Sequence, residues 1–348
     1  MMRLLALWLL LLAAPAAAND SLPSYVPRQA VSGTISIWGH GAYGKRLEFI
    51  EGLVSGWEEA FRAYHPGIRF KNRLHGTASA IGALYMGTGD LALLGREIWP
   101  PEIAAFEEVF GYPPTGIEVM TGSLDVRNKG YAIAIFVHKD NPIKGLTLAQ
   151  LDAIYGVERR RGLAPVNSWG DLGLTGAWAD RPINLYGLPI ARGFAIYLQD
   201  RVFLGSQLWK PSLREFPDDP HSVSVETDGA GRMLATLAAD PYGIGYAGLA
   251  YSDPGVKVVP LAEHAGEPFV MPTRESVADR NYPLTRIISL FINKPPDRPA
   301  QPKVAEFIRY LLSREGQDVV EREGGGYLPL PTAIAKREIE KLDTPVDK

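Results

Sequence analysis

The loop GHGAYGK, from Gly39 to Lys45, lies between an apolar run and a long amphipathic pattern. Gly39, Gly44 and Lys45 have the G-x-x-x-x-G-K spacing of a nucleotide-binding loop, in which backbone N–H groups hold phosphate. The next position supplies a magnesium-binding hydroxyl in such loops, and here it is Arg46. The spacing therefore indicates an oxyanion at the start of a helix rather than a magnesium nucleotide.

Three further loops resemble the first in composition and place. HGTASA (75–80), GREIWPP (95–101) and GLPIARG (187–193) each lie between an expected strand and an expected helix. In an open α/β sheet such loops gather at the carboxyl ends of the strands, where ligands bind. Helix N-termini there present unpaired N–H groups and partial positive charge, and small residues let an anion approach them. The four loops predict one shared anion site.

Side-chain donors in these loops support the same chemistry. Thr77 and Ser79 carry hydroxyl groups, and Arg96 and Arg192 carry planar guanidinium groups that suit oxyanions. Taken singly, each loop is better explained as a turn or a helix cap. Arg192 could equally form a surface ion pair, for example with Asp200. Four loops of one type favour the binding site.

The histidines and hydroxyls give no pattern of a metal enzyme or a hydrolase. His40 and His75 each precede a Gly at an expected strand end, so both could donate to one anion or share a metal. The six histidines include no H-x-x-x-H pair, and Ser79 does not lie in a G-x-S-x-G elbow. We therefore expect a binding protein without cofactor, metal or catalytic residues, although a phosphatase stays open as an alternative.

The N-terminus has the pattern of a signal peptide. Met1 to Leu12 hold one Arg and a mostly apolar run, and small residues follow at Ala16 and Ala18. We expect cleavage after Ala18 and export to the periplasm, where ATP is not normally available. The chain contains no Cys, so it has no disulfide, no thiolate metal site and no lipoprotein anchor. Its net charge of −3 argues against nucleic acid or an anionic membrane as partner.

Strand patterns alternate with helix patterns along the mature chain of about 330 residues. This alternation predicts an α/β fold with mostly parallel sheets flanked by helices, and the length predicts two domains. The expected strands are 34–38, 68–74, 90–95, 130–143, 183–187, 242–250 and 282–293. The expected helices are about 45–64, 79–86, 100–111, 147–156, 190–203, 229–241 and 304–323.

The run GYAIAIFVHKDNPIKGLTLAQLDAIYG (130–156) resembles the start of the second domain in the phosphate-binding proteins of phosphate ABC transporters. That family follows a strand with Asn-Pro, then Leu-Thr, then a helix ending in Ile-Tyr/Phe-x-Gly, with a Trp afterwards, as Trp169 follows here. YGIGYAGLAY (242–251), YPLTR (282–286) and SREGQDVVEREGGGYLPLP (313–331) are further matches. The resemblance covers nearly the whole mature chain, mainly through scaffold motifs.

The first two loops match the family's binding loops in part. GHGAYG keeps Gly39, Gly41 and Ala42 of the family's G-x-G-A-[ST]-F pattern and has Tyr43 at the hydroxyl position. Gly76 and Thr77 are equivalent to the family's Gly-Ser-rich second loop. The resemblance therefore implies that both loops contact the ligand.

The last two loops depart further from the family. Gly95 and Arg96, followed by Glu97, resemble a Ser-Arg variant of the third loop. In the fourth loop, Gly187 replaces an Arg, and the Ser-Gly-Thr positions are Ala191, Arg192 and Gly193, which weakens the case for inorganic phosphate. The predicted ligand-binding residues are His40, Gly41, Ala42, Tyr43, Gly76, Thr77, Ser79, Arg96, Glu97, Ala191, Arg192 and Gly193.

The resemblance implies a two-lobe periplasmic binding protein of the type II-like class. The first lobe would comprise residues 30–127 and 258–340, the second residues 128–257, with a hinge of two strands that lets the lobes close on ligand. The expected function is capture of phosphate or a similar oxyanion for an ABC permease, by a monomer that binds no nucleic acid. The alternative is a signalling or accessory protein with a degenerate pocket and a protein partner.

Overall fold

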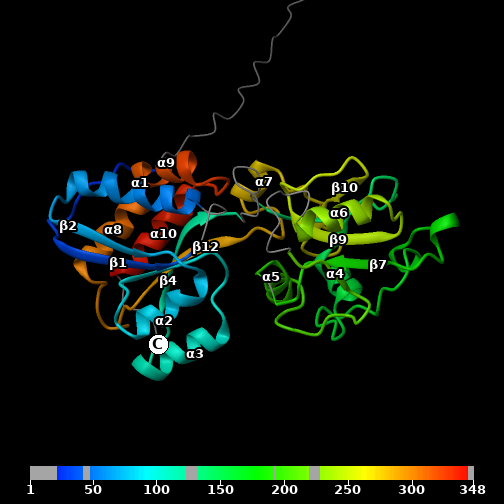
Figure 1. Cartoon of the computed structure of the whole chain (residues 1–348), viewed down its shortest axis with the longest axis horizontal. Helices are drawn as coiled ribbons and strands as arrows, with labels where there is room; N and C mark the ends of the chain where they lie inside the picture. Colours follow the sequence, from blue (N-terminus) through cyan, green and yellow to red (C-terminus); the bar gives the residue numbers. More distant parts are fainter. Residues whose placement is uncertain (1–21, 42–47, 123–131, 192, 219–227, 344–348) are drawn as a thin grey trace, which may run out of the picture.

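Five strands form the sheet of the first lobe, in the order β2-β1-β3-β12-β4 (Figure 1). The computed structural model describes residues 22–41, 48–122, 132–191, 193–218 and 228–343. The strands are β1 (Gly33–Gly39), β2 (Ile68–Arg73), β3 (Leu91–Leu94), β4 (Thr115–Thr121) and β12 (Ile287–Ile292). All four residues of β3 are buried, as expected of a strand covered on both faces.

The second lobe contains another five-stranded sheet, in the order β10-β5-β9-β7-β8. Its strands are β5 (Ile133–His138), β7 (Asn184–Gly187), β8 (Arg214–Glu215), β9 (Gly243–Gly248) and β10 (Val256–Val259). A short parallel pair, β6 (Leu146–Thr147) and β11 (Leu261–Ala262), lies beside it. The α/β fold class and the two-lobe architecture are as predicted.

Both sheets are mixed, whereas the sequence predicted mostly parallel sheets. In the first lobe β1 pairs in parallel with β2 and β3, but β12 is antiparallel to both β3 and β4. In the second lobe β5 is antiparallel to β9 and β10. The reason lies in the chain path, because β12 is inserted into the first sheet on the return from the second lobe.

Amphipathic helices cover the first sheet. They are α1 (Glu48–Tyr64), α2 (Ala80–Tyr85), α3 (Pro100–Phe110), α8 (Pro302–Leu311), α9 (Arg314–Glu323) and α10 (Thr332–Asp343). The predicted single helix over 304–323 is wrong, since α8 ends and α9 begins at the Ser313 cap. The Ser313 hydroxyl accepts a hydrogen bond from the Gly316 N–H at 3.3 Å and donates to the Tyr310 carbonyl at 2.7 Å. A side chain bonded in this way stabilises the start of a new helix.

In the second lobe, α4 (Leu148–Tyr155), α5 (Gly193–Arg201) and α6 (Gly229–Ala238) follow the predicted segments closely, whereas the short helix α7 (Arg274–Ala278) was not predicted. At the start of α4, Thr147 and Gln150 form a reciprocal capping box, with N-to-O distances of 3.1 and 2.8 Å. α5 lies at the edge of the second lobe that faces the first (Figure 1).

The chain passes between the lobes after β4 and again before β12. Val259, Leu261, Val277, Tyr282 and Leu284 belong to the hydrophobic core of the second lobe. We therefore propose that the second crossing lies near residue 285 rather than at residue 258. Among the described helices, none is both long and apolar enough to span a bilayer.

Candidate functional site

The loops that follow β1, β2 and β3 meet at one point. The Gly76 N–H donates to the Gly39 carbonyl at 2.9 Å, and the His40 N–H donates to the Leu93 carbonyl at 2.7 Å. The Gly95 N–H donates to the Thr77 hydroxyl oxygen at 3.1 Å. Because this hydroxyl accepts from Gly95, its own hydrogen can be donated elsewhere. Three of the four predicted loops are thus in direct contact.

Two glycines permit this close approach. Gly39 has a φ of 124°, and a Cβ there would lie 2.1 Å from the Leu93 carbonyl oxygen. A Cβ on Gly95 would lie 2.2 Å from Nδ1 of His40. Any side chain at either position would separate the loops, so these glycines are needed for the contact itself.

A buried ion pair joins the third loop to the chain segment between the lobes. Nε and Nη2 of Arg286 donate to the two Glu97 carboxylate oxygens at 3.1 and 2.9 Å. The Arg286 side chain is only 4% exposed, whereas that of Glu97 is 26% exposed. The guanidinium also lies over the rings of Tyr197 and Phe194 on α5, at 5.1 and 5.9 Å from their centroids. Arg286 therefore links the anion-site loops to the second lobe.

His40 lies beside this pair. Its Nε2 is 3.0 Å from the Tyr327 hydroxyl. Burial, with the nearby Arg286 charge as a smaller cause, lowers the pKa of His40 from 6.5 to about 4. The imidazole is consequently neutral at neutral pH. It can take part in neutral hydrogen bonds but cannot add positive charge to the site.

Acidification from pH 7 to pH 4 should destabilise the protein through His40. The unfolded chain takes up the His40 proton near pH 6.5 and the folded chain only near pH 4, so stability present above pH 6.5 is lost between these values. The expected loss is about 3 kcal/mol. Denaturant unfolding of His40→Gln should show a shallower pH dependence than wild type. The exposed His264→Gln serves as control, and a slope unchanged in His40→Gln would contradict the assignment.

Arg96 and Ser79 make contacts within the first lobe. Nη1 and Nη2 of Arg96 donate to the Glu102 carboxylate at 2.9 and 2.8 Å, and the guanidinium lies 3.6 Å from the Trp99 ring centroid. The Ser79 hydroxyl donates to the Gly76 carbonyl at 2.9 Å. Both side chains thus brace the loops around them, and Arg96 has fewer donors left for a ligand than the sequence implied.

The fourth loop faces the third across the space between the lobes. A cavity of about 480 Å³ has Glu97 in one wall and Ala191 in the other. Ala191 is exposed, and Gly193 is the first residue of α5.

Ala42, Tyr43 and Arg192 lie outside the described residues, so their predicted contacts with ligand stay predictions. Gly41 also lies close to the chain that follows β2, since a Cβ on it would lie 2.2 Å from the Leu74 carbonyl oxygen.

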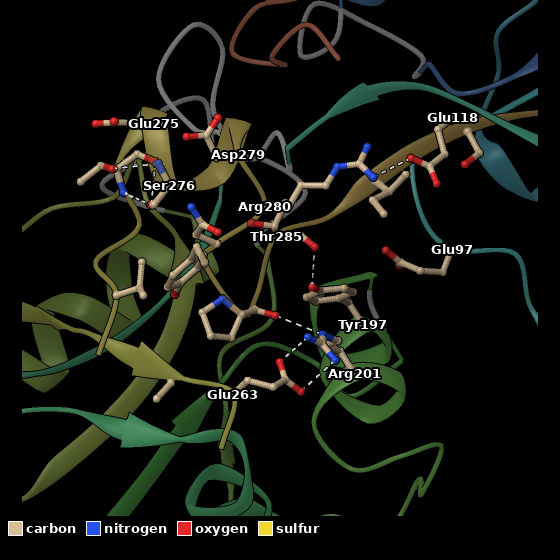
Figure 2. Close-up of a pocket in the computed structure, with 18 of the residues that line it drawn as sticks. Glu97, Glu118, Tyr197, Arg201, Glu263, Glu275, Ser276, Asp279, Arg280 and Thr285 are labelled. Carbon is tan, nitrogen blue, oxygen red and sulfur yellow. Dashed lines mark hydrogen bonds and ion pairs between the residues drawn. The ribbon is translucent and has the colours of Figure 1, made fainter. Parts of the chain in front are cut away.

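On the other side of Glu97 the lobes enclose a larger cavity of about 1150 Å³. Figure 2 shows Glu97 and Glu118 entering it from the first lobe and Arg201 and Glu263 from the second. Several of its charged groups pair with one another. Arg280 lies 2.7 Å from Glu118, and Arg201 donates to Glu263 at 3.2 Å. Within the described residues, no group of three His, Asp or Glu side chains is placed to hold a metal ion.

Sequence reasoning missed Arg286, Tyr197 and Tyr327. Arg286 ends the YPLTR motif and Tyr327 lies in GGGYLPLP, two segments that carried the family resemblance only as scaffold. The available signal for Arg286 was its place directly before a buried strand pattern, because Arg is rarely buried unless it is paired.

Comparisons with known proteins identify the family of this chain. The model of the PBP superfamily domain matches residues 48–315. The phosphate-binding protein PstS of Pseudomonas aeruginosa is 34% identical over 330 residues, covering 94% of this chain and 93% of that protein. This chain therefore belongs to the PBP superfamily and, within it, to the family of the phosphate-binding protein PstS.

Solved structures show the same fold. PstS from Borrelia burgdorferi aligns with a TM-score of 0.57 at 16% identity, covering 86% of this chain and all of that one. An ABC-type phosphate transport receptor from Vibrio cholerae aligns with a TM-score of 0.53 at 18% identity, covering 85% of this chain and all of that one. At these identities the structures support the two-lobe α/β architecture alone.

Proposed function

We propose that this protein binds phosphate or a similar oxyanion between its lobes and delivers it to an ABC permease. The observation that carries the proposal is the contact of the loops after β1, β2 and β3 at the cleft, opposite the start of α5. The PstS relative is named for binding phosphate. The twelve residues predicted from the sequence are the proposed binding set, with Arg286 added as the residue that positions Glu97.

Two side chains of this set define the chemistry of the ligand. The Thr77 hydroxyl can donate to an oxyanion, as can N–H groups at the starts of α1 and α5. The Glu97 carboxylate can only accept, so it favours a ligand that keeps a proton of its own. Hydrogen phosphate has such a proton, whereas sulfate has none at neutral pH. We therefore expect phosphate to bind more tightly than sulfate.

The proposed setting is the periplasm. It rests on the predicted signal peptide cut after Ala18, which lies outside the described residues. The protein would bind the oxyanion, close its lobes around it and release it to the permease without catalysing a reaction. Charge-assisted hydrogen bonds contribute about 1.5–3 kcal/mol each, so a few could give the ~8 kcal/mol of micromolar binding. We propose that it acts as a monomer and binds no nucleic acid.

A second candidate is an accessory or signalling protein with the same fold. It is favoured by the pairing of Arg96 with Glu102 and of Arg286 with Glu97, which engages two cations near the site internally. Such a protein would act through a protein partner and bind anions weakly.

Calorimetric titration of the exported protein decides between the two. Its first residue should be Asn19, as read by N-terminal sequencing, and inorganic phosphate should bind with micromolar affinity, at least tenfold more tightly than sulfate. Absence of heat with phosphate, sulfate and phosphonates alike would contradict the transport proposal and leave the accessory function. A cytoplasmic protein that retains Met1 would contradict export.

A further inference from the structure

A stripe of cations lies on β2, the edge strand of the first sheet. β2 pairs only with β1 among the described strands, and it lies at the end of the first lobe away from the second lobe (Figure 1). Its exposed side chains are Arg69, Lys71 and Arg73. Because they alternate with Phe70 and Asn72, all three lie on the same face of the sheet. We call these three residues the cationic stripe.

The residues that alternate with the cationic stripe face the helices of the first lobe. Phe70 packs against Phe307 of α8, with ring centroids 5.0 Å apart. The Asn72 amide donates to the Glu58 carboxylate of α1 at 2.6 Å. The cationic stripe consequently lies on the face of the sheet that α1 and α8 leave uncovered.

The neighbouring part of β1 shares this uncovered face. Three residues of β1 pair in register with the three cations, and they are Thr34, Ser36 and Trp38. Thr34 is exposed, and the other two are partly exposed. The Trp38 indole N–H donates to the Thr88 carbonyl at 3.2 Å, which holds the ring at the Arg73 end of the stripe. Two adjacent strands thus present a polar, cationic face to solvent.

Within the described residues, the cationic stripe has no ion-pair partner. Its one side-chain hydrogen bond there joins Arg73 to the Asn72 carbonyl at 3.0 Å. Two acids near these strands are engaged elsewhere, since Glu58 bonds Asn72 and Asp90 pairs with Lys303 at 2.8 Å. The whole chain has a net charge of −3, so the stripe is a local field of the opposite sign.

We propose that β2 is a docking edge for an extended acidic segment of a protein partner, which adds to the first sheet as a further strand. Side chains on one face of an extended chain recur every two residues, about 7 Å apart, in the segment as in β2. Asp or Glu at alternate positions of the segment therefore meets Arg69, Lys71 and Arg73 one by one. The outer N–H and C=O groups of an edge strand supply main-chain hydrogen bonds to the same segment.

An anionic lipid surface matches the cationic stripe less well. Binding to such a surface gains from apolar side chains that enter the membrane. Trp38 is the only large apolar side chain on this face of β1 and β2, and it is partly buried with its N–H bonded. A straight row of cations beside an open backbone edge instead matches the geometry of a strand. The inference goes beyond the proposed function and holds for either candidate.

Fluorescence anisotropy of labelled peptides with the full mature protein tests the proposal. One peptide of six residues, the length of β2, alternates Thr and Glu, and the other has the same composition with its Glu residues consecutive. The alternating peptide should bind roughly tenfold more tightly, because exposed ion pairs are individually weak and only this spacing forms all three together. Raising the salt from about 50 to about 300 mM should weaken its binding, since exposed charges are screened.

Two charge-reversal variants make the test specific to β2. Lys71→Glu should weaken binding of the alternating peptide roughly tenfold, because the central pair becomes a repulsion. Lys139→Glu makes the same change of charge at an exposed position of the second lobe and should keep the wild-type affinity for the peptide. Phosphate affinity should stay at the wild-type value in Lys71→Glu, so this test and that of the proposed function fail independently.

Each contrary result has a distinct meaning. Equal binding of the two peptides, or of the alternating peptide to wild type and Lys71→Glu, would overturn strand addition. Binding of vesicles of phosphatidylglycerol and phosphatidylcholine without binding of either peptide would overturn it in favour of a membrane surface. Absence of all binding would also overturn it and leave the cations as protection of the edge strand against aggregation.

Discussion

Replacing Glu306 with Ala is expected to lower the free energy of unfolding by about 3–5 kcal/mol, the cost of removing one partner from a buried charged network. Glu306 on α8 is fully buried. One carboxylate oxygen accepts from the Tyr25 hydroxyl at 2.7 Å and from the Arg28 N–H at 3.2 Å. The other accepts from Arg309 at 3.0 Å. All three donors would lose their acceptor in the variant.

The network ties the N-terminal segment to the first lobe. Tyr25 is 6% exposed, and its hydroxyl also lies 2.7 Å from Nε2 of the buried His65. Nδ1 of His65 accepts from the Val31 N–H at 3.4 Å. Since Nδ1 accepts, Nε2 carries the proton and donates to Tyr25, which leaves the Tyr25 hydrogen for Glu306. Burial lowers the pKa of His65, which is consistent with this neutral form.

Chemical denaturation of two variants, Glu306→Ala and the milder Tyr25→Phe, measures the effect on the free energy of unfolding. Tyr25→Phe removes one hydroxyl and should cost about 1–3 kcal/mol. Glu51→Ala, at an exposed position of α1, is the matched control and should stay within about 0.5 kcal/mol of wild type. A cost below 1 kcal/mol for Glu306→Ala would show that water replaces the carboxylate. Tyr25 lies six residues after the predicted first residue, Asn19, so the expected cleavage keeps this segment intact.

The meeting of the first three loops could be predicted from the sequence. Glycines and small polar residues after strand patterns mark the carboxyl edge of a sheet, and β1, β2 and β3 are neighbours through parallel pairing. Thr77 follows β2 and Gly95 follows β3, and these strands flank β1, so the contact between the two residues follows from the strand order. The local sequence pattern and the strand order together therefore predict that the three loops meet.

The roles of individual side chains at the site could not be predicted in the same way. The type of Arg96 alone predicts an anion donor, yet Glu102 in the first turn of α3 accepts from both of its Nη groups. Glu97 was predicted to bind ligand, but its ion pair with Arg286, distant in the chain, could not be predicted. The antiparallel insertion of β12 in the first sheet likewise depends on the return path of the chain. Pairings between distant segments leave no local pattern.

Arg286→Ala is expected to weaken both the fold and oxyanion binding. The guanidinium is nearly buried, so its loss removes two charge-assisted hydrogen bonds to Glu97 and the contact with Tyr197, at an expected cost of about 3–5 kcal/mol. Glu97 keeps its charge and lines the cleft, so the site becomes more negative by one charge. Oxyanion affinity should therefore fall roughly ten- to hundredfold, the equivalent of about 1.5–3 kcal/mol.

A double variant separates charge from packing in this result. Arg286→Met with Glu97→Gln removes both charges and fills much of the volume, so stability should recover by at least half of the single-variant loss, since replacing a buried ion pair by neutral groups is often near neutral. Affinity should recover partly, because no unpaired carboxylate then faces the anion. The exposed pair of Arg274 and Glu321, 55% and 52% exposed, is the control, and Arg274→Ala should cost at most about 1 kcal/mol. Equal phosphate affinity in wild type, Arg286→Ala and the double variant would place the ligand away from Glu97 and remove this ion pair from the binding site.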